Sequence, residues 1–233
     1  MHICYIVAMV AEAEPFVQHF GLTEVEGAFL PLPCRLLQTR VGSHTLSLVL
    51  NGQQHGSDLV GCEAASVATL AALQQLHPDL VINSGTCGAF ASNGAGIADV
   101  YVGTGAMFHD RRVPGDDAWA TQSLGNYPVW QGSAALAEAL GLKQGKVTTG
   151  SSLDMQPCDL QLIQENGGEL KDMEGAAIGF VCSLLQVPVL YVKSVTDLCD
   201  SGAATYEEFS RNLHAASEAL NKANQRVIKY LLD

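Results

Sequence analysis

Two carboxylates border the most apolar part of the chain, "KDMEGAAIGFVCSLLQVPVLYVKSVTDLCD" at residues 171–200. Glu174 opens one apolar segment and Asp197 closes the next. Burying an unpaired charge is costly, so a carboxylate in such a setting needs a partner or a chemical role. These two residues are therefore the first candidates for a functional site.

The sequence places Glu174 in the first turn of an almost wholly apolar helix, where the positive end of the helix dipole favours an ionised carboxylate. An ionised carboxylate can accept two hydrogen bonds at once, which suits the cis-diol of a ribose. Taken alone, a charge that merely complements the dipole is the simpler interpretation.

Asp197 ends a strand whose composition predicts burial. Burial raises the pKa of a carboxylic acid, which can then hold and donate a proton near neutral pH. The alternative is an N-cap for the segment that follows, with Asp200 as the competing cap.

A third carboxylate candidate follows the first apolar run, in "IVAMVAEAEP". Glu12 and Glu14 both lie there, and Pro15 favours the start of a helix at that point. One glutamate could act as a general base and the other as a first-turn charge, and periodicity does not choose between them.

The stretch "NSGTCGA", residues 83–89, follows a buried strand. Its two glycines, with Thr86 and Cys87 between them, would let the backbone turn tightly and present N–H groups to a ligand. An ordinary strand-to-helix turn is equally compatible. The stretch is neither a G-x-G-x-x-G fingerprint nor a P-loop.

Other chemistry-bearing patterns are missing from the sequence. It contains no H-E-x-x-H, no G-x-S-x-G and no regular Cys/His spacing, so we predict no metal, no cofactor and no serine nucleophile. The charged cluster at 109–112 is interpreted as a solvated loop.

The elements that must position these residues alternate between strands and helices. Apolar runs predict strands at 3–9, 35–41, 44–50, 79–84, 97–108, 145–150 and 187–195. Helical periodicity appears at 58–76, 133–141, 174–186 and 206–232. We expect an α/β fold with a central mixed β-sheet flanked by helices, forming one domain over residues 1–233.

Polar or flexible groups follow four of these strands, at 9–12, 84–88, 150–154 and 196–197. Ligands of open α/β sheets bind beyond the carboxyl ends of the strands, so these segments are expected to converge on one site. The irregular stretch 109–132 is too long for a plain connection and suggests a lid or an interface loop.

The composition of the chain limits the kinds of molecule that it is expected to bind and the compartment in which it is expected to function. The 233 residues carry a formal net charge of −12, which argues against nucleic acid and against an anionic membrane surface. Seven cysteines, an odd number with no C-x-x-C pair, are best explained as reduced thiols in a cytoplasmic protein. The apolar N-terminus has no basic residue ahead of it and is interpreted as a core strand, not a signal peptide.

Several segments together resemble the nucleoside phosphorylase superfamily, and within it the 5′-methylthioadenosine/S-adenosylhomocysteine nucleosidases. The matching segments are "IVAMVAEAEP", "NSGTCGAF", "FHDRRVP", "TTGSSLDM", "KDMEGAAIGFV" and "VKSVTD", in the family's order over roughly residues 3–200. "DMEGAA" and "VTD" are the motifs most specific to this family. The sequences "TGSSLDM" and "FHDRRVP" resemble the plant-type branch most closely.

The resemblance implies a role for each candidate. Asp197 would protonate nitrogen 7 of adenine, Glu12 rather than Glu14 would activate water, and Glu174 would hold the ribose hydroxyls. The remaining implied substrate contacts are Met9, Thr86, Cys87, Gly88, Phe108, Leu153, Met173 and Thr196. Of these, Leu153 would read the adenine edge through its backbone, and Met9 and Phe108 would line the 5′-alkylthio pocket.

The resemblance also implies a homodimer, with residues 109–132 near the interface, and an adenine nucleoside as the small-molecule substrate. Two positions depart from the family pattern. Leu153 stands where bacterial members often have an aromatic residue, and Ala89 stands where nucleosidases often have glycine. Aliphatic packing would then replace stacking against the base.

Two rival functions fit the same resemblance. A purine nucleoside phosphorylase would use phosphate, but Asn83 stands where related phosphorylases carry an arginine, and "MVAEAEPF" has no basic residue. A non-catalytic nucleoside-binding member would be expected to lack Glu12 or Asp197, and both are present. The sequence therefore predicts hydrolysis of the N-ribosidic bond of methylthioadenosine, with S-adenosylhomocysteine as a further candidate substrate.

Overall fold

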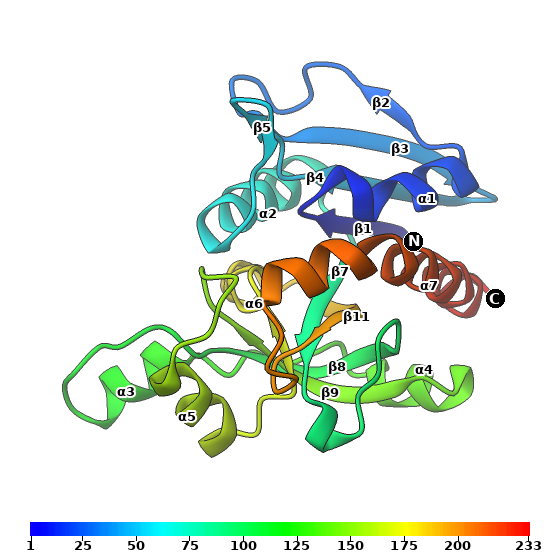
Figure 1. Cartoon of the computed structure of the whole chain (residues 1–233). Helices are drawn as coiled ribbons and strands as arrows, with labels where there is room; N and C mark the ends of the chain where they lie inside the picture. The colour runs from blue at the N-terminus through cyan, green and yellow to red at the C-terminus, as the bar shows by residue number, and fades with distance from the viewer.

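A nine-stranded mixed sheet runs through the computed structural model, which describes all residues 1–233 (Figure 1). Its strands are β1 (His2–Val7), β2 (Thr23–Val25), β3 (Arg35–Val41), β4 (His44–Leu50), β7 (Leu80–Ala89), β8 (Val100–Phe108), β9 (Lys143–Thr149), β10 (Leu170–Asp172) and β11 (Val189–Leu198). Their order is β10-β9-β8-β11-β7-β1-β4-β3-β2. Two short strands, β5 (Gln53–Gln54) and β6 (Ser57–Asp58), form a separate hairpin.

Helices cover both faces of the sheet (Figure 1). They are α1 (Val10–Phe20), α2 (Cys62–Leu76), α3 (Asp117–Leu124), α4 (Ser133–Leu140), α5 (Pro157–Glu165), α6 (Gly175–Leu184) and α7 (Thr205–Leu232), with a 3₁₀ turn, η1 (Ala91–Asn93). One apolar core lies under α2 and α6, and the other lies under α1, α4 and α7. The predicted α/β fold with a mixed sheet flanked by helices is confirmed.

The central strands β1, β7 and β11 are parallel neighbours and almost entirely buried. Strands covered on both faces read as continuous apolar runs, which explains why these segments lack alternation. β10 pairs with β9 on one side and with β7 on the other, so five strands curl into a small closed unit. The carboxyl ends of β1, β7, β9, β10 and β11 meet at one place.

Several predicted elements agree closely with the structure. β3 and β4 have the predicted bounds and form an antiparallel hairpin in which Val41 pairs with His44. Helix α7 begins at Thr205, one residue before its predicted start. None of the helices is both long and apolar enough to cross a membrane.

Three local expectations are wrong. Helix α1 begins at Val10, five residues before Pro15, which lies inside the helix. Residues 83–89 do not form a turn, because β7 continues through them to Ala89. The irregular stretch 109–132 contains the short helix α3, capped by the Asp116 carboxylate, which accepts hydrogen bonds from two backbone N–H groups.

Strand β11 carries an irregularity that matters for the site. Its register against β7 shifts between Val195 and Asp197, the signature of a β-bulge. Side chains normally alternate between the two faces of a strand. The shift allows the consecutive residues Thr196 and Asp197 to line the same cavity.

Candidate active site

A cavity of about 200 Å³ opens where these strand ends meet. All of the site residues predicted from the sequence line it, except Phe108. The lining residues are Ala8, Met9, Glu12, Val60, Thr86, Cys87, Gly88, Leu153, Lys171, Asp172, Met173, Glu174, Thr196, Asp197, Tyr206 and Phe209. Residues from distant parts of the sequence therefore share one polar pocket with apolar walls.

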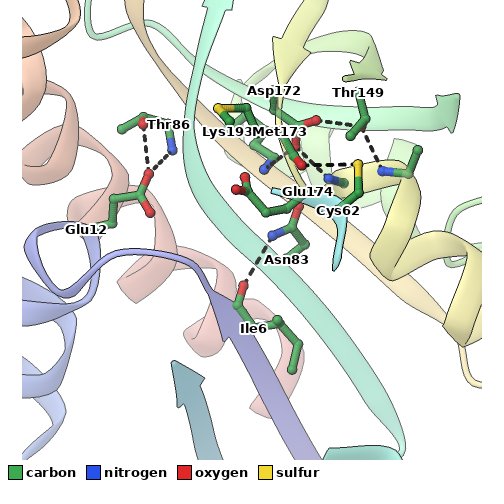
Figure 2. Close-up of polar contacts among 12 residues, drawn as sticks. Ile6, Glu12, Cys62, Asn83, Thr86, Thr149, Asp172, Met173, Glu174 and Lys193 are labelled. Carbon is green, nitrogen blue, oxygen red and sulfur yellow. Dashed lines mark hydrogen bonds and ion pairs between the residues drawn. The ribbon is translucent and has the colours of Figure 1, made fainter. Parts of the chain in front are cut away.

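Glu12 lies in the first turn of α1, which begins directly after β1, and its side chain is buried. The Thr86 backbone N–H and hydroxyl both donate to Glu12 Oε1, at 2.6 and 2.7 Å (Figure 2). Burial raises the pKa of Glu12, while these hydrogen bonds and nearby Lys193 oppose the shift. Glu14 is exposed and accepts a hydrogen bond from Gln18, so it lies away from the cavity.

The two glycines of "NSGTCGA" do not form a turn. They allow other side chains to approach the backbone of β7 closely. A Cβ on Gly85 would lie 3.2 Å from Glu12 Oε1. A Cβ on Gly88 would lie 2.7 Å from both Asp197 Oδ2 and Cys199 Sγ. β7 therefore passes close to both carboxylates: a side chain at Gly88 would displace Asp197 or Cys199, and one at Gly85 would press against Glu12.

Glu174 is the N-cap of α6, and its Oε1 accepts a 2.7 Å hydrogen bond from the Gly61 backbone N–H. Asp172 and Lys193 lie in the same buried group (Figure 2). Lys193 Nζ is 2.7 Å from Asp172 Oδ2, and both side chains are almost completely excluded from solvent. Asp172 also accepts from the Thr149 hydroxyl at 2.6 Å and the Gly175 N–H at 2.9 Å, so its buried charge is well compensated.

The charges of Asp172, Glu174 and Lys193 influence one another's pKa values. Burial and the neighbouring Asp172 raise the pKa of Glu174 to about 7. The helix dipole was expected to keep Glu174 ionised, and burial outweighs that effect. Burial alone would lower the pKa of Lys193, but the carboxylates of Asp172, Glu174 and Glu12 more than compensate and raise it.

Asp197 lines the cavity from near the end of β11. Its Oδ1 is 2.7 Å from the Thr196 hydroxyl, which is also 3.2 Å from the carbonyl oxygen of Cys87. Burial raises the pKa of Asp197, against the lowering influence of the Thr196 hydroxyl and of Lys171. Asp197 can therefore carry a proton at a higher pH than an exposed aspartate.

The alternative role of Asp197 as a helix cap does not apply, because the N-cap of α7 is Ala204. Asp200, the competing candidate, accepts hydrogen bonds from the backbone N–H groups of Ala91 and Ser92. It therefore binds the start of η1 and does not cap α7.

Leu153 belongs to the loop 151–156, between β9 and α5, and is the residue of that loop that lines the cavity. Lys171 Nζ donates to the carbonyl oxygens of Ser152 and Leu153, at 2.9 Å each. The backbone at Leu153 is thus fixed by a buried ammonium group from β10.

Phe108 does not line this cavity, so that prediction is wrong for the single chain. It lies in a neighbouring groove with Cys62, Ala177 and Phe180, on the side of the sheet that α2 and α6 cover. The Arg111 guanidinium lies over its ring, 4.5 Å from the centroid.

Sequence reasoning missed several lining residues: Ala8, Val60, Lys171, Asp172, Tyr206 and Phe209. It also missed Lys193, which pairs with Asp172 behind the wall. A lysine inside the apolar run "VPVLYVKSV" was a usable signal, because a buried cation requires an anionic partner. Val60 and Tyr206 carried no such signal, since both are uncharged residues at the start of a predicted helix and both are largely exposed.

The arrangement can place acidic groups on two sides of a bound molecule. No group of three or more histidine, cysteine, aspartate or glutamate side chains is arranged to hold a metal ion. Glu12 and Glu174 both act on the buried Lys193, whereas Asp197, a carboxyl group with a raised pKa, is influenced by Lys171 instead. Such a pair suits a reaction that builds positive charge on one fragment and negative charge on the other.

Comparison with known proteins agrees with this geometry. A 5′-methylthioadenosine nucleosidase of Arabidopsis thaliana is 40% identical over 233 residues, covering 98% of this chain and 86% of the relative. A 5′-methylthioadenosine/S-adenosylhomocysteine nucleosidase of the same plant is 36% identical, covering 98% of this chain and 91% of the relative. The resemblance to the plant-type nucleosidases drawn from the motifs is confirmed.

The same similarity is seen in three dimensions. The apo structure of an Arabidopsis thaliana 5′-methylthioadenosine nucleosidase superposes with a TM-score of 0.95 at 39% identity, covering 98% of this chain and 95% of that one. The family model described as the phosphorylase superfamily matches residues 2–229. With this match across almost its whole length, the chain belongs to the phosphorylase superfamily.

Proposed function

We propose that this chain hydrolyses the N-ribosidic bond of 5′-methylthioadenosine, giving adenine and methylthioribose. The observation that carries the proposal is the placement of Glu12 and Asp197 in one cavity, each with the environment its role needs. The identity to the Arabidopsis nucleosidases supports the choice of substrate.

In the proposed reaction Asp197 donates its proton to nitrogen 7 of adenine while the bond to the anomeric carbon breaks. The sugar becomes positively charged as the bonding electrons leave with the base. Glu12 takes a proton from water, whose oxygen then bonds to the anomeric carbon. Each positioned proton transfer contributes about 10²–10⁴-fold to the rate.

The remaining predicted contacts complete the substrate site in this proposal. Glu174 accepts from the ribose hydroxyls, with Met173 beside it. Thr86, Cys87 and Gly88 lie near the ribose and the water, Thr196 is a further substrate contact, and the Leu153 backbone meets the adenine edge. Met9 lies against the 5′-alkylthio group.

Water is the expected nucleophile, not phosphate. No arginine lines the cavity, and its one lysine, Lys171, is occupied by two carbonyl oxygens. Lys193 behind the wall is paired with Asp172. Asn83 lies within β7 and donates to the Ile6 carbonyl oxygen, so it offers no charge to an anion. A phosphorylase needs fixed positive charge to hold a dianion.

The test is an assay of adenine release in phosphate-free buffer, followed by titration with phosphate. We expect free methylthioribose and a rate independent of phosphate. A rate that requires phosphate, with a sugar phosphate as product, would establish a phosphorylase instead. The same assay with S-adenosylhomocysteine measures whether the longer 5′ substituent is accepted.

We also infer that the chain forms a homodimer through the face that carries α2, α6 and residues 109–132. Large apolar side chains are exposed on all three: Val67 and Leu70 on α2, Phe180 and Leu184 on α6, and Trp119 on α3. Helix α3 projects from the body of the molecule (Figure 1). Exposed apolar side chains gathered in this way are typical of protein interfaces.

Light scattering on the wild type and on Leu184→Glu tests the dimer. We expect a dimer in the first case and a monomer in the second. Tyr230→Glu, at an exposed aromatic side chain of α7, which packs against the other core, is the matched control and should stay dimeric.

We further propose a cytoplasmic location, supported by seven cysteines that are all free thiols. Cell fractionation followed by thiol labelling before and after reduction would test it. Extra thiols appearing only after reduction would contradict the proposal.

A further inference from the structure

The cavity contains a cation that the proposed reaction leaves without a role. Lys171 comes from the three-residue strand β10, is 6% exposed, and lines the cavity. Its ammonium group has no carboxylate partner within ion-pairing distance, unlike that of Lys193, which pairs with Asp172. An unpaired buried ammonium is costly, so its retention calls for an explanation.

Two of its three donors are accounted for by the carbonyl oxygens of Ser152 and Leu153, at 2.9 Å each. These two residues are consecutive in the loop 151–156, which has no helix or strand of its own. The loop is otherwise held at its ends, where Ser151 N–H donates to Asp110 at 2.7 Å and Gln156 N–H donates to Asp159 at 3.1 Å. Lys171 therefore supplies the fastening at the middle of the loop.

We propose that Lys171 is a positioning residue of this site, whose ammonium group fastens the purine-facing loop 151–156 to β10 and maintains a positive charge beside Asp197. The first half follows from its two hydrogen bonds. The second half rests on the proposed hydrolase function, because it concerns the proton that Asp197 donates.

Four groups set the electrostatic surroundings of Asp197: Lys171 from β10, Glu208 from α7, and the thiols of Cys87 and Cys199. Burial raises the pKa of Cys199 to about 12 and that of Cys87 well above its usual range, so both thiols stay neutral. Glu208 accepts hydrogen bonds from the Leu198 N–H and the Ser201 hydroxyl. Lys171 is thus the cation that lowers the pKa of Asp197 directly, while Arg211 lies against Glu208.

The positive charge of Lys171 should shift the pH dependence of activity in one direction. Asp197 must be protonated to act, so activity falls as pH rises through its pKa. A nearby cation favours the ionised carboxylate and lowers that pKa. Removing the cation moves the alkaline limb of the pH–rate profile to higher pH.

Three substitutions separate the charge from the hydrogen bonds. Lys171→Met removes both, Lys171→Gln retains a donor without the charge, and Lys171→Arg retains both. Lys146→Met is the matched control, because Lys146 on β9 also donates to a backbone carbonyl, that of Asn166 at 3.3 Å, but does not line the cavity. Circular dichroism and urea unfolding establish that each variant folds.

For Lys171→Met we expect faster amide hydrogen exchange at 151–156 in the unliganded protein and a KM for methylthioadenosine raised about tenfold or more, because hydrogen bonds from a charged donor are the stronger ones. The alkaline limb should move to higher pH, and kcat at its plateau should fall less than KM rises. Lys171→Arg should have the same alkaline limb and the same KM as the wild type. Lys146→Met should also match the wild type in both. If Lys171→Met does not fold, Lys171→Gln should show the moved limb with nearly normal exchange.

Unchanged exchange at 151–156 in Lys171→Met would overturn the fastening role, and an unmoved alkaline limb in Lys171→Met and Lys171→Gln would overturn the charge role. Exchange is measured without turnover. A wild type that releases no adenine would therefore refute the hydrolase function, while the exchange comparison would still decide the fastening.

Discussion

Two groups of charged residues at the cavity compensate buried charge differently. In one group three carboxyl groups, Glu12, Asp172 and Glu174, share the single cation Lys193. In the other group the carboxyl group of Asp197 is influenced by the cation Lys171 without forming an ion pair. We name these the acidic wall and the purine wall.

The difference matches the charges that a breaking ribosyl–purine bond would develop. An excess of carboxyl groups stabilises a positive sugar, and an acid beside a cation suits a base that leaves with the bonding electrons. The acidic wall is joined by one ion pair and by backbone donors, whereas the purine wall includes a loop whose middle is held by one lysine. We therefore expect the acidic wall to dominate stability and the purine wall to dominate the first proton transfer.

The largest expected effect tests the purine wall. Asp197→Asn retains the shape and a hydrogen-bond donor but removes the transferable proton. Adenine release should fall about 10²–10⁴-fold, while binding of a nucleoside measured by calorimetry is retained. Turnover close to that of the wild type would mean that the acid is another group.

The next effect tests the acidic wall. Lys193→Met leaves Asp172 and its neighbours without their cation, which should lower the free energy of unfolding by about 3–5 kcal/mol. Lys143→Met is the matched control, because Lys143 pairs with Asp99 at the surface, and it should cost at most about 1 kcal/mol. Urea unfolding at neutral pH measures both, and equal losses would remove the contrast between buried and exposed pairs.

A smaller effect concerns the proposed ribose contact of Glu174. A 2′-deoxy substrate would leave part of a buried carboxylate without a donor, at a cost of about 1–3 kcal/mol in kcat/KM. In Glu174→Gln the penalty should shrink, because the unpaired charge is gone. If the two enzymes show the same 2′-deoxy penalty, Glu174 does not hold that hydroxyl.

The smallest effect is a dependence of stability on pH. The pKa of Glu174 is raised from an ordinary 4.5 to about 7, so the folded state binds more protons than the unfolded state between these values. Its contribution to stability is complete below about pH 4.5 and is lost as pH rises through about 7. The slope from one group is at most about 1.4 kcal/mol per pH unit.

Urea unfolding at several pH values from 4.5 to 8 measures this slope. Glu174→Gln should flatten it without abolishing it, because burial also raises the pKa of Glu12 and Asp197. A steeper slope in the variant would reverse the assigned direction.

Local patterns predicted much of the fold. The runs that form β3 and β4 are strongly apolar and joined by Gly42-Ser43, so bounds and pairing followed from the sequence. Helix α7 was clear because its apolar stripe persists over many turns. The strand β10 was missed because three residues carry no periodicity, although it supplies Lys171 and Asp172.

The site was harder to predict where contacts from distant segments decide it. The glycines of β7 suggested a turn, but they are required because Glu12 and Asp197 pack against the strand from elsewhere in the chain. Phe108 was assigned by resemblance, and the direction of its side chain depends on α2 and α6. Neither kind of information is present in a single short segment.

The shifted register of β11 changes which side chains face the cavity, but the strand remains paired with β7 on both sides of the shift. One extra residue between Val195 and Asp197 brings Thr196 and Asp197 to the same cavity, while the strand on either side remains paired with β7. Deleting that residue would restore regular alternation and leave the sheet able to form. Asp197 would still lie opposite Gly88, so the deletion would keep the acid in place and remove only the Thr196 hydroxyl that donates to it, which makes the bulge a device for supporting the acid and not for aiming it.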